Sequence, residues 1–310
     1  MGRYIVGRLL SIFLVLLAIT AITFLLMHAV PGGPFDETKQ ALSPEVKANI
    51  KRMYGLDKPL YVQYFNFVKT AVQLNFGYSY QYPGETILEV FARTCSPTLI
   101  IGAGTILVAI VLGILLGVLS AYGQNTWIDY AITFGSTLGL VIPSFVLAVA
   151  LVLVFTRALG WLPSGGWTKP QNVILPLMAN SLGPICFVTR YTRNSMLEVL
   201  HREYVRAARA KGVRGTRLAT RHILRNALTP LVTVIGPMLP GIITSSVFVE
   251  SMFRVPGMGS LFAGAVGFRD YPMIMATTTV IGFLVAFANL LTDIAYTWVD
   301  PRVRLGSSRR

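Results

Sequence analysis

The chain has 310 residues, of which 54% are hydrophobic and only 13% are charged. A soluble domain typically carries about 25% charged residues, so this composition excludes a large soluble core and indicates a membrane protein with several spans. The net charge of +14 invites a nucleic-acid partner. We exclude nucleic acid, because the basic residues divide by membrane side, as described below.

Motifs for catalysis or metal binding do not stand out. Cys95 and Cys186 lie far apart and fit neither a disulfide framework nor a CxxC metal site. The three histidines lack HExxH-type spacing, and there is no GxxxxGKS or GxxxxGKT loop for ATP. We therefore predict no catalytic residue, no metal and no cofactor on this chain, which is not expected to be an enzyme.

Six stretches are apolar and long enough to cross a membrane, which takes about 20 mostly apolar residues. They cover approximately residues 9–30, 98–121, 130–155, 173–189, 228–249 and 273–299. The first is longer than the apolar region of a signal peptide and no A-x-A site follows it, so we interpret it as an uncleaved span. Pro176, Asn180 and Pro184 interrupt the fourth. The sequence thus predicts an all-α membrane protein with six transmembrane helices.

The distribution of Lys and Arg sets the orientation, because cytoplasmic loops carry an excess of both. With the N-terminus inside, the cytoplasmic segments hold 16 of these residues and the outer segments 11. Seven of the 11 lie in the long segment 31–97, and long loops cross the membrane largely regardless of charge. Both termini are therefore predicted to face the cytoplasm, in a multi-pass protein of the cytoplasmic (inner) cell membrane.

The outer segment 31–97 contains two predicted amphipathic helices. Residues 43–45 (Ser-Pro-Glu) are typical of a helix start, and Gly55 is a natural stop after residue 54. Residues 57–59 (Asp-Lys-Pro) begin a second helix, whose apolar residues recur at helical spacing: Leu60, Tyr64, Phe67, Val68 and Ala71. We expect both helices on the outer face. For their role, contact with a ligand and a packing collar without ligand contact remain alternatives.

The stretch 190–225 carries ten Lys or Arg residues and only two acids. Within it, residues 203–212 read EYVRAARAKG, in which the alanines favour a helix that another surface can approach closely. Gly212 is placed to end this helix, and a second helical stretch, residues 217–226, leads to Pro230. The pattern predicts a helix, a turn and a helix beneath the membrane. For the role of this loop, contact with a soluble partner at the membrane surface and a simple topology anchor that holds the flanking spans remain alternatives.

The spans are nearly free of charge, whereas ion-coupled carriers usually keep ionisable groups inside the bundle. Asp293 is the main exception, and it lies near the inner end of the last span, where we interpret it as a packing or capping residue. The energy source is therefore expected on another chain. An ion-coupled secondary carrier and a non-transport membrane scaffold or sensor remain alternatives.

Residues 206–212 (RAARAKG), followed by Pro230, resemble the EAA loop of ABC-importer permeases, with Arg206 in place of the usual Glu. The loop of the peptide-transporter branch shows a similar departure from the usual pattern. Further segments that match that branch are residues 1–34, 54–64 (YGLDKPLYVQY), 74–79 (LNFGYS), 142–145 (IPSF), 159–163 (LGWLP), 249–253 (VESMF), 256–259 (PGMG), 269–272 (RDYP), 289–293 (NLLTD) and 300–304 (DPRVR). The chain resembles the dipeptide/oligopeptide ABC importer permeases along essentially its whole length.

The resemblance implies a type I ABC importer permease fold. Its domains would be residues 1–30 as first transmembrane helix, 31–97 as external segment, and 98–310 as a five-helix core with a coupling loop at 190–227. Expected partners are a second, homologous permease, two ATPase subunits that bind ATP and Mg, and an extracytoplasmic solute-binding protein. The cargo would be a dipeptide or oligopeptide; glutathione, nickel chelates, opines and sugars are not separated from these by the sequence.

The resemblance also implies the site. The contact with the ATPase is expected to involve Glu203, Tyr204, Arg206, Ala207, Ala208, Arg209, Ala210, Lys211 and Gly212. Ala207, Ala208 and Gly212 are the main candidates. For Arg209, Lys211 and Arg214, acidic groups on the ATPase and lipid headgroups remain alternative partners.

Two further groups are expected near the transport pathway. Pro143 and Ser144 are predicted to kink the third span. Glu250, Arg254 and Asp270 are predicted at the outer mouth. These three either contact the binding protein or pair among themselves, and structural pairing is favoured.

Overall fold

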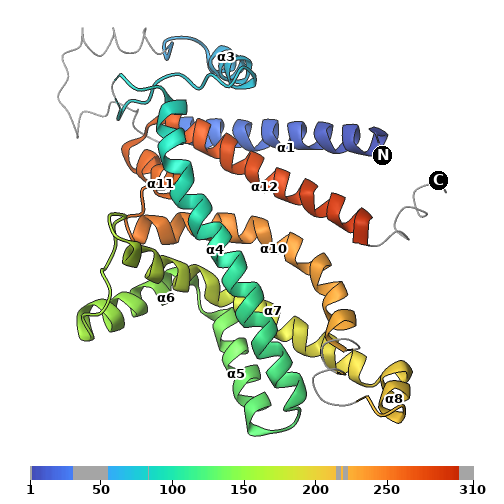
Figure 1. Cartoon of the computed structure of the whole chain (residues 1–310). Helices are drawn as coiled ribbons and strands as arrows, with labels where there is room; N and C mark the ends of the chain where they lie inside the picture. The colour runs from blue at the N-terminus through green and yellow to red at the C-terminus, as the bar shows by residue number, and fades with distance from the viewer. Residues whose placement is uncertain (1, 31–54, 83, 214–217, 219–222, 300–310) are drawn as a thin grey trace. The chain divides into compact units, whose positions relative to one another are not determined.

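The computed structural model describes residues 2–30, 55–82, 84–213, 218 and 223–299 (Figure 1). In these ranges the chain is helical, which confirms the predicted class, and an isolated bridge joins Tyr78 and Thr86. The helices are α1 (Gly2–Ala29), α3 (Leu60–Val72), α4 (Ile87–Tyr122), α5 (Trp127–Val141), α6 (Ser144–Leu151), α7 (Ile174–Leu200), α8 (Glu203–Ala210), α10 (Arg225–Met252), α11 (Met258–Phe268) and α12 (Tyr271–Val299). A π-helix (Val152–Ala158) continues α6, and a 3-10 helix (Pro170–Val173) precedes α7.

Five helices within the described ranges are long and apolar enough to cross a membrane: Val6–Ala29, Ile87–Tyr122, Pro170–Leu200, Ile235–Met252 and Tyr271–Asp293. A sixth crossing results if the bent pair Trp127–Val141 and Ser144–Ala158 counts as one span. Each corresponds to one of the six predicted stretches. The interrupted fourth stretch forms a continuous helix with Pro184 inside it.

Helix α4 is longer than the sequence indicated. It begins at Ile87 instead of near residue 98 and has 36 residues, or about 54 Å at 1.5 Å per residue, well beyond the roughly 30 Å of a bilayer core. Its first turns carry charged residues on the exposed side, while Ile87, Val90 and Phe91 are buried. A search for unbroken apolar runs therefore starts this helix too late.

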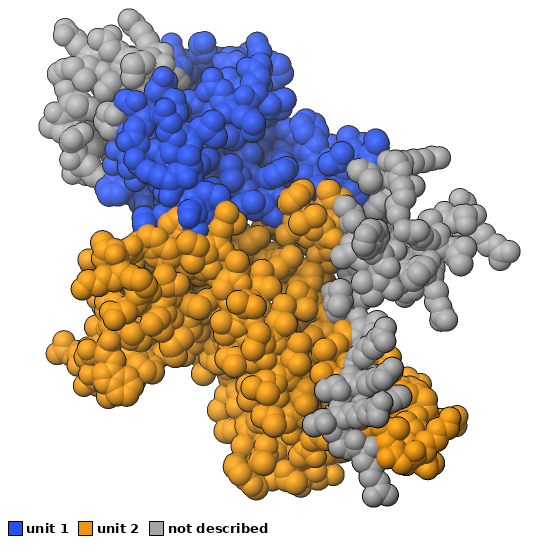
Figure 2. Space-filling view, in the orientation of Figure 1, with its two compact units in different colours: residues 1–96, 256–284 blue, residues 97–255, 285–310 orange. Residues whose placement is uncertain are grey.

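The chain divides into two compact units, shown in blue and orange in Figure 2. Unit 1 consists of Met1–Ser96 and Pro256–Leu284, and unit 2 of Pro97–Val255 and Val285–Arg310. This division by contacts groups α11 and the start of α12 with the N-terminal segment. The division by role that the resemblance implies, at residues 30 and 97, stays a prediction.

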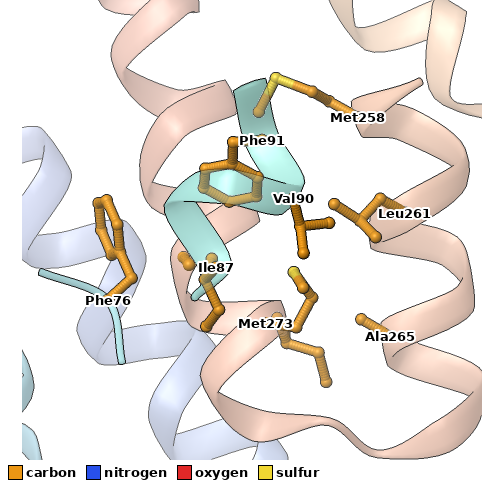
Figure 3. Packing of buried hydrophobic residues seen from close by; sticks show 10 residues of the cluster. Phe76, Ile87, Val90, Phe91, Met258, Leu261, Ala265 and Met273 are labelled. Atoms are coloured by element: carbon orange, nitrogen blue, oxygen red, sulfur yellow. The ribbon is translucent and has the colours of Figure 1, made fainter. Parts of the chain in front are cut away.

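The core of unit 1 gathers apolar side chains around the first turns of α4. Figure 3 shows side chains from the loop before α4, from α4 itself, from α11 and from α12: Phe76, Ile87, Val90, Phe91, Met258, Leu261, Ala265 and Met273. Helix α11 was missed in the outer segment before the last span. Its 11 residues are too few for a span, but its buried residues Met258, Leu261 and Ala265 recur at helical spacing.

Helix α3 confirms the second of the two predicted outer helices. It follows Pro59 and packs on α1, where the Tyr64 hydroxyl donates a hydrogen bond of 2.9 Å to the carbonyl of Leu17. The first predicted outer helix, residues 44–54, lies outside the described residues.

In unit 2, α7 packs against α5, α6 and α10. Glycines allow two neighbouring helices to lie very close to it. A Cβ at Gly117 of α4 would be 2.6 Å from Cβ of Thr192, and one at Gly139 of α5 would be 2.5 Å from the Cys186 sulfur. Small residues at such crossings are typical of helices that pack in membranes, where van der Waals contact drives association.

Candidate coupling site

Helix α8 forms where the sequence predicted it, from Glu203 to Ala210. Glu203 lies in its first turn and Arg209 in its last, the charges that suit the two ends of a helix dipole. The N–H of Gly212 donates to the carbonyl of Arg209 (3.0 Å), and the N–H of Val213 to that of Ala208 (3.1 Å). Gly212 has φ +81°, a left-handed conformation that glycine adopts without the cost of a Cβ. The helix therefore ends in a defined glycine cap.

The inner face of α8 is part of the core of unit 2. Val205 is fully buried and Ala208 is 8% exposed, and these positions lie one turn apart. They belong to a cluster with the ends of α4 and α7 and the residues before and at the start of α10: Ala121, Met196, Val199, Leu218, Ile223 and Ala227. Ala208, one of the main contact candidates, thus faces this protein's own core and seats the helix.

The remaining candidate residues of the site are exposed: Glu203, Tyr204, Arg206, Ala207, Arg209, Ala210, Lys211 and Gly212. The exposed surface thus combines three cations and one acid with small side chains and one aromatic ring. Arg202, just before α8, forms an exposed ion pair with Glu198 of α7, and such pairs contribute little to stability. Most of the surface of α8 is therefore available to another protein.

Two parts of the predicted loop fall elsewhere. Arg214 and half of the second helical stretch at 217–226, namely residues 217 and 219–222, lie outside the described residues. Pro230 lies in the second turn of α10, which begins at Arg225.

The basic stretch that begins at residue 190 starts inside α7, which runs to Leu200. Arg193 does not lie on a free basic surface, because its guanidinium forms an ion pair with Asp129 of α5, with Nε 2.6 Å from Oδ1. Sequence reasoning missed Asp129. The available signal was an acid at the head of the third span, after a predicted cytoplasmic turn without any Lys or Arg.

Pro143 and Ser144 lie where the third span was predicted to kink, and the structure has a sharp break there. Helix α5 ends at Val141, Pro143 caps α6, and the two helical segments meet at 106°. A cavity of about 350 Å³ lies beside the break, between α6, α7 and α10. Its lining includes Ser144, Asn180, Pro184, Met238 and Gly241.

The predicted outer-mouth residues differ in their surroundings. Glu250 and Asp270 are fully buried, whereas Arg254 is exposed and adopts a left-handed conformation with φ +52°. Asp270 accepts hydrogen bonds from the N–H of Met273 (3.2 Å) at the start of α12 and of Tyr80 (3.1 Å).

Two more donors complete the surroundings of Asp270. The Ser79 hydroxyl and the Gln81 N–H (3.3 Å) also donate to its carboxylate. This carboxylate therefore caps α12 and holds the loop before α4, and the predicted outer-mouth role stays a prediction.

Comparison with known proteins identifies the relatives of this chain. The family described as "Binding-protein-dependent transport system inner membrane component" matches residues 113–305, and its N-terminal counterpart matches residues 1–97. The chain is 37% identical over 305 residues to the dipeptide transport system permease protein DppB of Bacillus subtilis (strain 168), covering 98% of this chain and 99% of that protein. It is 39% identical over 306 residues to the oligopeptide transport system permease protein OppB of Haemophilus influenzae, covering 98% and 100%.

Solved structures show the same fold. The MetNI methionine ABC transporter in an inward-facing conformation matches with a TM-score of 0.55 and 18% identity, over 69% of this chain and 98% of that chain. An amino acid ABC transporter with histidines matches with a TM-score of 0.51 and 13% identity, over 70% and 94%. At these identities the likeness concerns the fold alone, and it confirms the predicted type I ABC importer permease fold.

Proposed function

This chain belongs to the family of binding-protein-dependent transport system inner membrane components, and from that premise we propose that it is the permease subunit of an ATP-driven importer of dipeptides or oligopeptides. The observation that carries the proposal is full-length similarity to relatives named as dipeptide and oligopeptide permeases. The exposed helix α8, seated on its own core, supplies a physical means of coupling.

The proposed assembly contains a second, homologous permease, two cytoplasmic ATPase subunits and an extracytoplasmic solute-binding protein that delivers the peptide. The ATPase subunits hold ATP and Mg, and this chain hydrolyses nothing itself. We place the protein in the inner membrane with both termini in the cytoplasm, because the Lys and Arg distribution favours that orientation.

In the proposed mechanism, α8 is seated in a groove of one ATPase subunit. ATP-driven closure of the two ATPases displaces α8, and the helices packed against it switch from an inward-open to an outward-open arrangement. Peptide then enters from the binding protein, and hydrolysis resets the first state. Binding energy that differs between two conformations is sufficient for this cycle, and no bond in the cargo changes.

The outer surface of α8 supports this role. Arg206, Arg209 and Lys211 provide cations for acidic groups on the ATPase, and Ala207 and Ala210 let that surface approach closely. Lipid headgroups are the competing partners for the cations. The cavity beside the break at Pro143 is the proposed position of this subunit's share of the transport pathway.

Gly212→Asp tests the contact. Asp tolerates the left-handed conformation better than most residues, so the cap of α8 is kept while a negative charge is added at the contact surface. Purification in mild detergent, with mass spectrometry of the associated proteins, is expected to recover a second permease and P-loop ATPases with the wild-type chain. The ATPases should be lost with Gly212→Asp.

Gly160→Asp is the matched control. Gly160 also has a positive φ (+65°) with open space around it, but it lies far along the chain from α8, after the π-helix. This variant should retain the ATPases. Normal transport and ATPase recovery with a well-assembled Gly212→Asp chain would contradict the proposed coupling role.

A further inference from the structure

An ion pair and the hydrogen bonds to its carboxylate join three helices in unit 2, next to the cluster beneath α8. Asp129, at the start of α5, is 2% exposed. Its carboxylate receives the Arg193 guanidinium of α7 in a two-point contact, Nε to Oδ1 at 2.6 Å and Nη2 to Oδ2 at 2.7 Å. The Ser120 hydroxyl, near the end of α4, donates to Oδ1 at 2.5 Å. One carboxylate thus links α4, α5 and α7.

Other donors complete the hydrogen bonding of this carboxylate. The N–H of Asn125, in the turn between α4 and α5, donates to Oδ2 at 3.1 Å. The Thr133 hydroxyl, one turn along α5, lies 3.3 Å from Oδ1. A carboxylate with this many donors is held in one orientation, and a two-point arginine contact adds directional precision that a single hydrogen bond lacks.

Stability alone is a weak explanation for such a pair. Taking two charges out of water costs about as much as their attraction returns, so well-packed apolar residues often replace a buried ion pair without loss of stability. Apolar packing already sets a preferred crossing angle between helices, and a two-point ion pair restricts that angle further. The fork of Arg193 on Asp129 fixes α7 against the α4–α5 hairpin.

The residues that bind Asp129 lie close to the cluster beneath α8, both on α4 and on α7. On α4, Ser120, which donates to the Asp129 carboxylate, directly precedes Ala121, a member of the cluster beneath α8. On α7, Arg193 lies three positions before Met196, a fully buried member of the same cluster. A displacement of α8 therefore reaches the ends of α4 and α7. There the Asp129 carboxylate holds both helices, α4 through Ser120 and α7 through Arg193.

We infer that Asp129 and Arg193 are positioning residues for coupling: their ion pair makes the ends of α4, α5 and α7 move as one body when α8 is displaced. The inference rests on the proposed function, because it assumes that α8 receives the force of the ATPases. Without the pair, the α4–α5 hairpin lags behind α7, and less peptide is transported for each ATP hydrolysed.

The test uses the complete complex in lipid vesicles, with peptide uptake and ATP hydrolysis measured together. Asp129→Asn keeps the shape and removes the charge. We expect it to retain the ATPases and hydrolyse ATP, while peptide transported per ATP falls by about fivefold or more, the lower end of typical coupling between sites. Arg193→Lys keeps the charge but loses the fork, so its loss should be intermediate.

Glu85→Gln is the control. It breaks the exposed ion pair with Arg93 in unit 1, and we expect uptake per ATP to be unchanged. If Asp129→Asn does not assemble, Ser120→Ala and Arg193→Lys carry the test with the same measurement.

A distance measurement separates coupling from mere stability. With Cys95 and Cys186 replaced, spin labels at two exposed positions, Gln124 between α4 and α5 and His201 at the end of α7, report the separation of the hairpin and α7. Wild type should give a narrow distance distribution that ATP leaves in place, because the hairpin and the end of α7 move as one body. Asp129→Asn should broaden it.

Three outcomes are distinct. Wild-type uptake per ATP and a wild-type distance distribution in assembled Asp129→Asn and Arg193→Lys would overturn the inference. Loss of uptake per ATP with a broadened distribution would support it. A wild-type chain that binds no ATPase, or whose uptake is indifferent to Gly212→Asp, would overturn the proposed function instead.

Discussion

The close crossing of α4 and α7 gives a sharp prediction about stability. A Cβ at Gly117 would be 2.6 Å from Cβ of Thr192 and 2.7 Å from the carbonyl oxygen of Thr189, against an ordinary contact of 3.4 Å or more. The carbonyl belongs to the α7 backbone and cannot rotate away. Gly117→Ala therefore forces the helices apart by several tenths of an ångström, at a cost of about 1–3 kcal/mol for overpacking.

Gly102 of the same helix is the matched control, because a Cβ there meets nothing within 4 Å. Both substitutions gain about the same helix propensity, roughly 1 kcal/mol. The difference between them therefore isolates the crossing.

The assay is the thermal midpoint of the purified chain in mild detergent, followed by the fraction that stays monodisperse after heating. Gly117→Ala should melt below Gly102→Ala by on the order of 2–6 °C. Equal midpoints, or a higher one for Gly117→Ala, would refute the close packing of α4 on α7.

Three further changes test particular contacts. Ala208→Glu places a charge in the core beneath α8 and should abolish recovery of a folded chain, whereas Ala207→Glu on the exposed side should leave its elution volume unchanged. Asp270→Asn weakens the hydrogen bonds that cap α12 and hold the loop before α4, by about 1–3 kcal/mol, so limited proteolysis of that loop should be faster than in wild type. Gly165→Ala places a Cβ against the backbone carbonyl oxygen of Phe253, well inside an ordinary contact, and should lower the thermal midpoint; an unchanged midpoint would contradict this contact.

The sequence by itself determined the elements whose signal lies within one continuous stretch. A membrane span needs only enough consecutive apolar residues, so six stretches were found and each has a helical counterpart. The signal for helix α8 also lies within one stretch, because its alanines favour a helix and Gly212 supplies the left-handed residue that ends it. The family resemblance was carried by short motifs spread along the whole chain, and full-length relatives confirm it.

The length of a helix and the angle at a break depended on tertiary packing. The first turns of α4 are amphipathic, and α11 is too short for a span, so both are stable only because their apolar sides meet in the core of unit 1. Pro143 predicted a bend in the third span, but the 106° between its two halves is set by the helices that pack around it.

Only the tertiary structure decided which side of α8 is available to a partner. Ala207 and Ala208 are equivalent in the sequence, but burial against α4 and α7 separates them. Asp129 and Arg193 lie 64 positions apart, and nothing near either residue indicates its partner. The distance between these two charges is fixed by the packing of helices and not by the order of residues, so only the tertiary structure shows the pair.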